Sequence, residues 1–257
     1  MLAGNTDPSM DPRAWRAPAH LMITELPIVL AHLYRTTDVG DVVDLELPAG
    51  IDDRHVVDLV TGAGFVVNGQ PRNGAIGPRV SATRAHTLAD TVGPGMTLLV
   101  CGINPSPYSA DIGVGYGRPG NRFWPAALMA DLVPTDRDPL AALEGGIGMT
   151  DLVKRPSRTA AEVTEAEYAD GFARVERLCR WLAPGAVCFV GLSGWRTVVN
   201  PKAVAGRQSV TVGGRPAYLM PSTSGLNAHE TKDSLAVHLR AAAALGRSTQ
   251  EGTCTGS

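Results

Sequence analysis

Residues 96–124 read MTLLVCGINPSPYSADIGVGYGRPGNRFW and divide into two parts of opposite character. Residues 96–103 are an almost uninterrupted apolar run, which is typical of a parallel strand covered on both faces. The run ends in a loop rich in glycine, proline and serine, and this loop returns to Phe123 and Trp124. Composition alone equally allows an ordinary strand-to-helix connection. The role of the loop therefore depends on what surrounds it.

The sequence after this stretch alternates strand and helix patterns. A second buried-type strand is predicted at 186–191, and shorter strands at 208–212 and 216–221. Helices are predicted at 123–133, 168–184, 193–199 and 232–246. This alternation predicts a three-layer α/β/α domain with a central, mostly parallel sheet. Ligands of such sheets bind beyond the carboxyl ends of the strands, where the loops 102–113 and 221–230 are both expected.

The sequence before residue 96 predicts a small N-terminal α+β extension. Its elements are a helix at 23–35, a strand at 41–48, a capped helix at 52–65 and a hairpin at 65–83. The last two resemble the end of a methyltransferase-type α/β domain, but no glycine-rich cofactor loop is present, which indicates a structural accessory. The expected organisation is a disordered or extended segment 1–20, an accessory region 21–95, a main domain 96–245 and a flexible tail 246–257.

Composition restricts the class of protein. The 257 residues are 44% apolar and 19% charged, as in soluble globular proteins, and neither a membrane-spanning run nor a secretory signal is recognisable. We expect a cytoplasmic protein. The four cysteines lack CxxC pairing and the histidines lack HxH or HExxH spacing, so no metal or cofactor is expected.

Charge is distributed unevenly along the chain. The net charge is −2, but residues 1–60 carry ten acidic and four basic residues, whereas residues 61–257 carry fifteen and nineteen. The most basic stretch, 191–240, has six basic residues against two acidic ones. This distribution permits contact with a phosphate backbone without requiring it.

The first loop resembles a motif of a known family. The residues that carry the resemblance are GINP at 102–105, Ser109, Ala110, Gly113, Tyr116 and PGNRFW at 119–124. In order and spacing they are similar to the mismatch-specific uracil/thymine DNA glycosylases of the uracil-DNA glycosylase superfamily. GMTDLVKRPS at 148–157 resembles an internal stretch of that family, and MPSTSGLNA at 220–228 resembles its second motif. The resemblance spans residues 96–245 and does not reach residues 1–95.

This resemblance implies a uracil-DNA glycosylase-like fold and a monofunctional glycosylase that excises uracil hydrolytically from mismatched double-stranded DNA, with thymine and etheno-cytosine as further candidates. Such an enzyme turns its target nucleotide out of the stack. Asn104 would position the attacking water; because an amide is a poor proton acceptor, it would not be a true general base. The alternative for Asn104 is a turn-forming asparagine before Pro105. Neither motif contains a lysine that could act as an amine nucleophile.

The base pocket implied by the resemblance has three further members. Tyr116 would stack on the flipped base, and main-chain amides around Ile103 and Tyr116 would bond the base carbonyls. Ser109 would line the pocket near the base edge. Phe123 and Trp124 are expected in the core, where they would anchor the loop.

The second motif implies contacts with DNA. Its candidates are Ser222, Thr223, Ser224, Gly225, Leu226 and Asn227. The three hydroxyl residues would bind phosphates, and the glycine would permit close approach of the backbone. Leu226 would be an apolar wedge that fills the gap left by the flipped nucleotide, the alternative being a residue tucked under the loop. Asn227 stands where the family often has an arginine, and Met220 where other superfamily members have a histidine.

The expected partner is double-stranded DNA that contains a mismatched or damaged base, bound by a monomer without a metal and away from membranes, in the cytoplasm and at the nucleoid. Basic residues near the two loops are candidates for phosphate contacts: Arg118, Arg122, Lys154, Arg155 and Arg158. Two other classes stay open. One is a glycosylase-like module that binds damaged DNA without cleaving it, and the other is a small-molecule enzyme on the same scaffold. An exposed Leu226 would argue against the latter.

Overall fold

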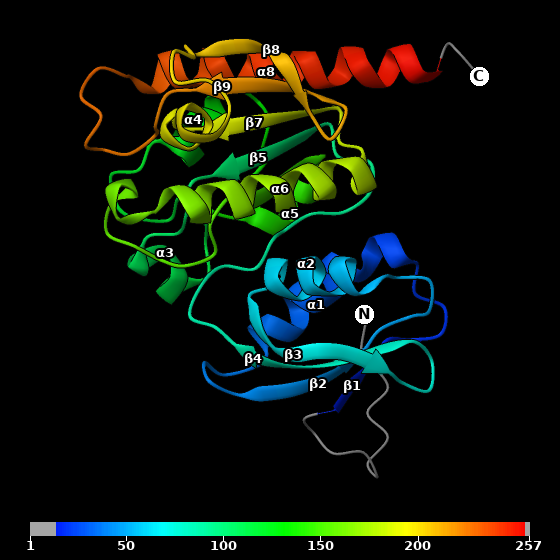
Figure 1. Cartoon of the computed structure of the whole chain (residues 1–257). Coiled ribbons are helices and arrows are strands. Elements are labelled where there is room, and N and C mark those ends of the chain that lie inside the picture. The colour runs from blue at the N-terminus through cyan, green and yellow to red at the C-terminus, as the bar shows by residue number, and fades with distance from the viewer. Residues whose placement is uncertain (1–13, 255–257) are drawn as a thin grey trace.

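The structure, a computed structural model, describes residues 14–254 and contains two sheets (Figure 1). The larger sheet has the strand order β6-β5-β7-β9-β8, with every neighbouring pair parallel except β8 and β9. Its strands are β5 (Leu98–Gly102), β6 (Ile147–Asp151), β7 (Ala186–Val190), β8 (Gly206–Val212) and β9 (Arg215–Met220). The central strands β5 and β7 are buried at every position, as their continuous apolar sequences predict.

Helices cover both faces of this sheet. They are α3 (Pro107–Ile112), α4 (Phe123–Met129), α5 (Pro139–Glu144), α6 (Glu165–Leu182), α7 (Ser193–Val198) and α8 (Lys232–Cys254), with a 3-10 turn η2 at Ala160–Glu162. Side chains of α4 and α8 share one apolar core with the sheet, and side chains of α6 and α7 share a second core on the opposite face. The predicted three-layer α/β/α arrangement with a mostly parallel sheet is confirmed.

Several elements of this unit differ from the sequence-based expectation, among them α5 and η2, for which no element was predicted. Strand β6 and helix α3 were not predicted, because glycines interrupt the apolar pattern of the first and prolines precede the second. The flexible tail expected from residue 246 is wrong for residues 246–254, which continue α8. Gly246 permits this, because a Cβ there would collide with the carbonyl oxygen of Thr97. One turn further on, Gln250 Nε2 donates to the carbonyl oxygen of Met96 at 3.2 Å.

A four-stranded sheet of order β1-β2-β4-β3 forms the small N-terminal unit. Its elements are β1 (Ala14–Arg16), η1 (Ile23–Glu25), α1 (Leu26–Arg35), β2 (Val42–Glu46), α2 (Asp53–Gly62), β3 (Phe65–Asn73) and β4 (Pro78–Arg84). The predicted helices, strand and hairpin are confirmed, and the Asp52 carboxylate caps α2 by accepting from the backbone N–H of His55 at 2.8 Å. Of the segment 1–20, only residues 14–20 are described, and β1 within them pairs with β2.

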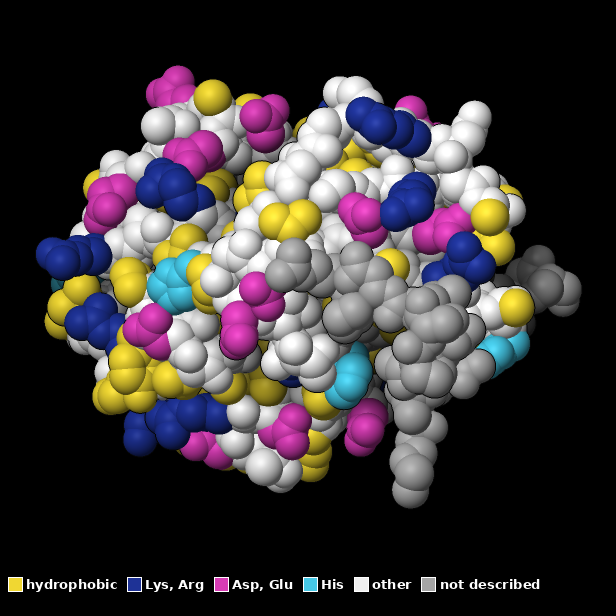
Figure 2. All heavy atoms as spheres, turned by 90° about the horizontal axis from the view of Figure 1, so that it is seen from below, with side chains coloured by type: hydrophobic (Ala, Val, Ile, Leu, Met, Phe, Trp, Pro, Cys, Tyr) yellow, Lys and Arg dark blue, Asp and Glu magenta, His cyan; other side chains and the backbone are white. Residues whose placement is uncertain are grey.

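Helices α1 and α2 lie between the small sheet and the larger unit (Figure 1). Figure 2 shows the molecule from below, from the side of the small sheet. On this face acidic and basic side chains are interspersed, without a large area of one sign. The described residues visible on this face therefore form no basic surface of the kind that attracts a phosphate backbone. No helix within residues 14–254 combines the length and apolarity needed to cross a membrane.

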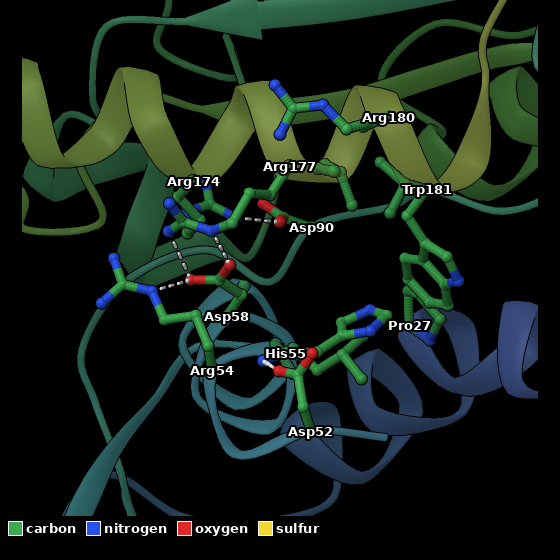
Figure 3. Close-up of a pocket in the computed structure, with 15 residues that line it drawn as sticks. Pro27, Asp52, Arg54, His55, Asp58, Asp90, Arg174, Arg177, Arg180 and Trp181 are labelled. Atoms are coloured by element: carbon green, nitrogen blue, oxygen red, sulfur yellow. Dashed lines mark hydrogen bonds and ion pairs between the residues drawn. The ribbon is translucent and has the colours of Figure 1, made fainter. Parts of the chain in front are cut away.

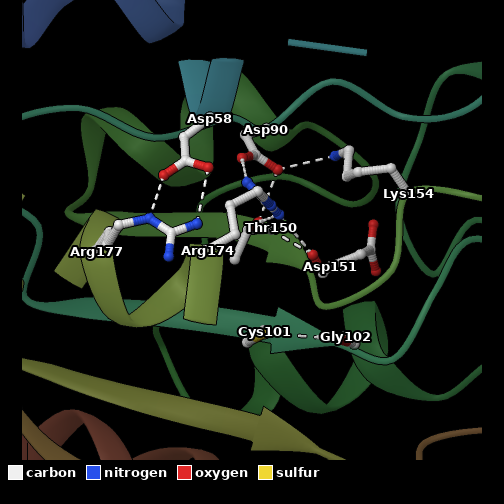
Figure 4. A network of polar contacts seen from close by, with 9 residues as sticks. All are labelled: Asp58, Asp90, Cys101, Gly102, Thr150, Asp151, Lys154, Arg174 and Arg177. Atoms are coloured by element: carbon white, nitrogen blue, oxygen red, sulfur yellow. Dashed lines mark hydrogen bonds and ion pairs between the residues drawn. The ribbon is translucent and has the colours of Figure 1, made fainter. Parts of the chain in front are cut away.

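Buried charges join the two units (Figure 4). The carboxylate of Asp90, in the connection between the units, accepts from Arg174 Nη1 at 2.7 Å, from Lys154 Nζ at 2.8 Å and from Thr150 Oγ1 at 2.7 Å. Its backbone N–H donates to the carbonyl oxygen of Gly62 at the end of α2. Burial alone would raise the pKa of Asp90, but the two cations outweigh it, so this pKa lies below its ordinary value.

Neutralising Asp90 should destabilise the fold strongly. The substitution Asp90→Asn leaves the Arg174 and Lys154 cations buried without a counter-charge, so we expect a loss of about 3–5 kcal/mol in the free energy of unfolding. Denaturant unfolding at pH 7.5 measures it. The matched control is Asp44→Asn, which breaks the exposed pair with Arg79 and should cost less than about 1 kcal/mol. Equal losses in the two variants would contradict this role of Asp90.

Candidate active site

The two predicted loops meet at the carboxyl edge of the larger sheet. One follows β5 and the other follows β9, and both strands run parallel to β7. The backbone N–H of Arg122, in the first loop, donates to the carbonyl oxygen of Thr223, in the second, at 2.9 Å. Gly225 lies so close to the first loop that a Cβ on it would be 2.8 Å from the carbonyl oxygen of Gly120. The fold thus joins two segments that are about 100 residues apart in the sequence.

Arg122 fixes the shape of the second loop. Its Nη2 donates to the carbonyl oxygens of Ser224, at 2.7 Å, and of Asn227, and its Nη1 donates to that of Glu230. A phosphate contact by Arg122 is therefore wrong, since its guanidinium is used inside the protein. The same holds for Lys154, which is bound to Asp90. Arg155 pairs with Glu167 at 2.7 Å, but its side chain is 48% exposed, so a phosphate contact by Arg155 stays a prediction. Arg118 and Arg158 are exposed and stay predictions.

Asn104 is held in one orientation directly beyond the end of β5. Its Nδ2 donates to the carbonyl oxygen of Arg155 at 3.0 Å and to Ser157 Oγ at 2.8 Å. Because a carbonyl can only accept, the nitrogen must face this side. Ser157 Oγ in turn donates to the carbonyl oxygen of Thr159 at 2.7 Å. With both amide hydrogens used, the Oδ1 atom is the group of Asn104 that can accept a hydrogen bond from a water molecule.

Tyr116 lies against the core side of the first loop. Its ring stacks on Phe123 with centroids 4.2 Å apart and an interplanar angle of 21°, so one face of the ring is covered. Phe123 and Trp124 are buried, as expected, and Trp124 Nε1 anchors the loop by donating to the carbonyl oxygen of Gly115 at 2.8 Å. Tyr116 has a left-handed backbone, with φ of 57°, which costs free energy in a non-glycine residue. Its hydroxyl is buried without a hydrogen-bond partner in the described chain.

Asp151, at the end of β6, is a residue of the candidate site that was not predicted from the sequence. In the sheet register it is the partner of Gly102, and a Cβ on Gly102 would collide with Asp151 Oδ1 and lie 3.0 Å from the Tyr116 hydroxyl. Burial raises the pKa of Asp151 to about 6; Asp90 adds to this effect, while Lys154 and Arg174 oppose it. A weak signal was present in the sequence, since Asp151 stands two positions after the short stretch 147–149.

The predicted hydroxyl contacts are mostly used within the protein. Ser109 is buried in the first turn of α3, where Ser106 Oγ accepts from its backbone N–H at 3.1 Å and donates to its hydroxyl. The side chain of Ser109 is therefore not accessible on the surface of the loop. Thr223 is 2% exposed, so its prediction as a phosphate contact is wrong. Ser222 and Ser224 are half-buried, and their hydroxyls accept from backbone N–H groups of the same loop.

Leu226 and Gly225 are the exposed members of the second loop's candidate set. Leu226 is 81% exposed, so the alternative of a side chain tucked under the loop is wrong. Asn227 braces the loop, because its Nδ2 donates to the carbonyl oxygen of Ser222 at 2.9 Å. Ile103 is half-buried against the core, and its carbonyl oxygen accepts from the backbone N–H of Val153 at 2.9 Å. The second loop therefore presents an exposed apolar tip, Leu226, on a braced backbone.

A cavity of about 290 Å³ lies elsewhere, between α2 and α6 (Figure 3). Its cations are paired: Arg177 binds Asp58 through Nε and Nη2, and Arg54 lies 3.8 Å from the same carboxylate. His55 packs edge-on against Trp181 with ring centroids 4.3 Å apart. This cavity is an interface between the two units, and it contains none of the predicted site residues.

No family model matches the chain. Among solved structures it is similar to a solution NMR structure from Methanosarcina acetivorans that is described as a "putative Uracil DNA glycosylase". The sequence identity is 20% and the TM-score is 0.41, and the match covers 64% of this chain and 97% of that chain.

The raised pKa of Asp151 predicts a pH-dependent cost in stability. A proton binds more tightly to the native carboxylate, with a pKa of about 6, than to an unperturbed aspartate of pKa 3.8, so wild-type stability falls as pH rises through this interval. Asp151→Asn removes the charge, and we expect it to raise the free energy of unfolding by at most about 3 kcal/mol at pH 7.5 and by about half of that at pH 5.

Denaturant unfolding at the two pH values measures this difference. Asp111→Asn is the control, because Asp111 is an exposed carboxylate on α3 and should show no such gain. An Asp151→Asn protein that is no more stable than the wild type at pH 7.5 would refute the raised pKa.

Proposed function

We propose that this protein is a monofunctional DNA glycosylase that turns a uracil-type base out of mismatched double-stranded DNA and hydrolyses its N-glycosidic bond. The observation that carries the proposal is the orientation of Asn104, whose Oδ1 is left as a water acceptor beside a loop that ends in an exposed leucine. A metabolite enzyme has no use for such an apolar tip. Thymine and etheno-cytosine are further candidate bases.

In the proposed reaction, the cost of removing the nucleotide from the stack is offset by Leu226, which enters the gap in the duplex. A water held by Asn104 Oδ1 attacks the anomeric carbon as the glycosidic bond breaks. The bonding electrons leave with the base, and backbone N–H groups near Ile103 and Tyr116 stabilise the charge that develops on its carbonyl oxygen. Because Asn104 is a weak base, the water loses its proton late, to solvent, and turnover is modest.

An amine nucleophile is absent from both loops, since neither 102–124 nor 220–231 contains a lysine. Lys154, in the stretch 148–157, is bound to Asp90 at 2.8 Å. A free amine would be needed for a covalent Schiff base with the sugar. Hydrolysis by water is therefore the proposed route.

Removing the Asn104 side chain should abolish base release and leave DNA binding intact. We expect Asn104→Ala to lower the single-turnover rate of uracil release by about 100-fold or more, since it loses the water ligand. Labelled duplexes with G·U, G·T and A·U pairs measure the rate, and Asn200→Ala, beyond the end of α7, is the matched control.

The outcomes of this experiment separate the candidate functions. Retained mismatch binding without base release by the wild type would favour a binding module. Undiminished release by Asn104→Ala would show that another residue positions the water.

Truncating Leu226 should weaken base flipping without changing stability. The side chain is 81% exposed, so Leu226→Ala removes little packing from the free protein but loses apolar contact inside the duplex, for which we expect about a ten-fold loss in release rate. The fluorescence of 2-aminopurine beside the target uracil reports flipping. Val237→Ala, an exposed position on α8, is the control, and equal effects of both variants on flipping would contradict the wedge.

A further inference from the structure

The carboxylate of Asp151 has no role in the hydrolysis described above, yet it lies inside the candidate site. It is partly buried at the end of β6, and it accepts no hydrogen bond from the described residues (Figure 4). A partly buried carboxylate without a hydrogen-bond partner is less stable than a fully hydrated one. The Tyr116 hydroxyl next to it is also buried and unpaired. An accessible carboxylate without a partner, beside a buried hydroxyl without a partner, indicates a ligand that would bind both.

The charged groups around Asp151 are engaged elsewhere. Lys154, after β6, and Arg174, on α6, both bind Asp90 of the connecting segment. Arg174 Nη2 contacts Asp151 only through its backbone carbonyl oxygen, at 2.7 Å. Burial raises the pKa values of Cys101 on β5 and of Tyr116 far above neutrality, so both groups stay uncharged. The carboxylate is therefore free to bind something that enters from the loop side.

We propose that the Asp151 carboxylate reads the Watson–Crick edge of the flipped base by accepting the N3–H of a uracil-type pyrimidine. The inference rests on the proposed function and deepens it. Uracil and thymine carry a hydrogen at N3, whereas cytosine presents a lone pair there, which a carboxylate repels. Once protonated, the same carboxyl can donate its O–H to N3 of a cytosine-type base. Asp151 is then a specificity-determining residue whose preference depends on pH.

The direction of this dependence follows from the pKa of about 6. Below pH 6 the carboxyl is mostly neutral, and above it the ionised form dominates. The ratio of the affinities for uracil and cytosine duplexes should therefore rise about ten-fold between pH 5 and pH 7.5. Above pH 7.5 this ratio should stay constant. The pKa of Asp90 lies below its ordinary value and that of Arg174 above its ordinary value, so both groups keep their charges throughout this interval.

The test measures binding as well as base release. Duplexes carry 2′-fluoroarabino-uridine or 2′-fluoroarabino-cytidine, which resist hydrolysis, each opposite an abasic spacer so that neither base has to be unpaired. We expect wild-type protein to prefer the uracil duplex at pH 7.5, and Asp151→Asn and Asp151→Ala to lose about ten-fold of that preference together with its pH dependence. Asp111→Asn should behave as the wild type. Release of uracil from a cleavable G·U duplex is followed in parallel.

The two readouts distinguish failure of the inference from failure of the proposed function. A preference and pH dependence that Asp151→Asn leaves unchanged would overturn the role of Asp151, whatever the rate of release. Wild-type preference that disappears in both Asp151 variants, without any uracil release, would support base reading and refute hydrolysis. Equal binding of both duplexes by the wild type would overturn the inference as well.

Discussion

The buried carboxylate of Asp90 is the interaction on which the arrangement of this protein depends. It neutralises Arg174 from α6 and Lys154 from the segment after β6, and its backbone is bonded to the end of α2. A single group thereby connects the small unit, a helix layer and the sheet. Breaking a buried pair costs several kcal/mol, whereas exposed pairs such as Arg79–Asp44 contribute little.

This network also reaches the candidate site through the chain. Lys154 begins the segment that supplies the carbonyl oxygen of Arg155 and the hydroxyl of Ser157, and these two groups orient Asn104. The position of Asn104 thus depends, through the segment 154–157, on the buried cluster of Asp90, Lys154 and Arg174. Arg122 has a similar role for the second loop, where it binds three carbonyl oxygens. Cations that look like phosphate ligands in the sequence serve here to shape the loops.

The site combines satisfied and unsatisfied polar groups. The amide of Asn104 and the hydroxyls of Ser222 and Ser224 have partners within the protein, whereas the Asp151 carboxylate and the Tyr116 hydroxyl have none in the described chain. Stability favours pairing of such groups, and functional sites are where proteins depart from it. The left-handed backbone of Tyr116 is a further cost in the same place.

Several parts of the fold could be predicted because their signals are local. The continuous apolar runs at β5 and β7, the capped helix α2 and the hairpin β3–β4 each have a pattern within about 20 residues. β6 escaped prediction because Gly146 and Gly148 interrupt its run, and they are tolerated since the neighbouring strand and Met96 fill the space. The end of α8 was not predicted, because it is held by contacts of Gln250 with Met96 and Thr97, which are distant in the sequence.

The sequence by itself determined the layer order, the two loops at the carboxyl edge of the sheet, and the placement of Asn104 and Leu226 on them, because strand periodicity and strand ends depend on neighbouring residues. Only the tertiary structure decided which partners Arg122, Lys154 and Arg155 bind, that Thr223 is buried, and that Asp151 faces Gly102 and Tyr116. The physical reason is the sequence separation of the residues that interact. The partners of a long charged side chain, and the degree of burial of a carboxylate, depend on residues that are distant in the sequence and become neighbours only after folding.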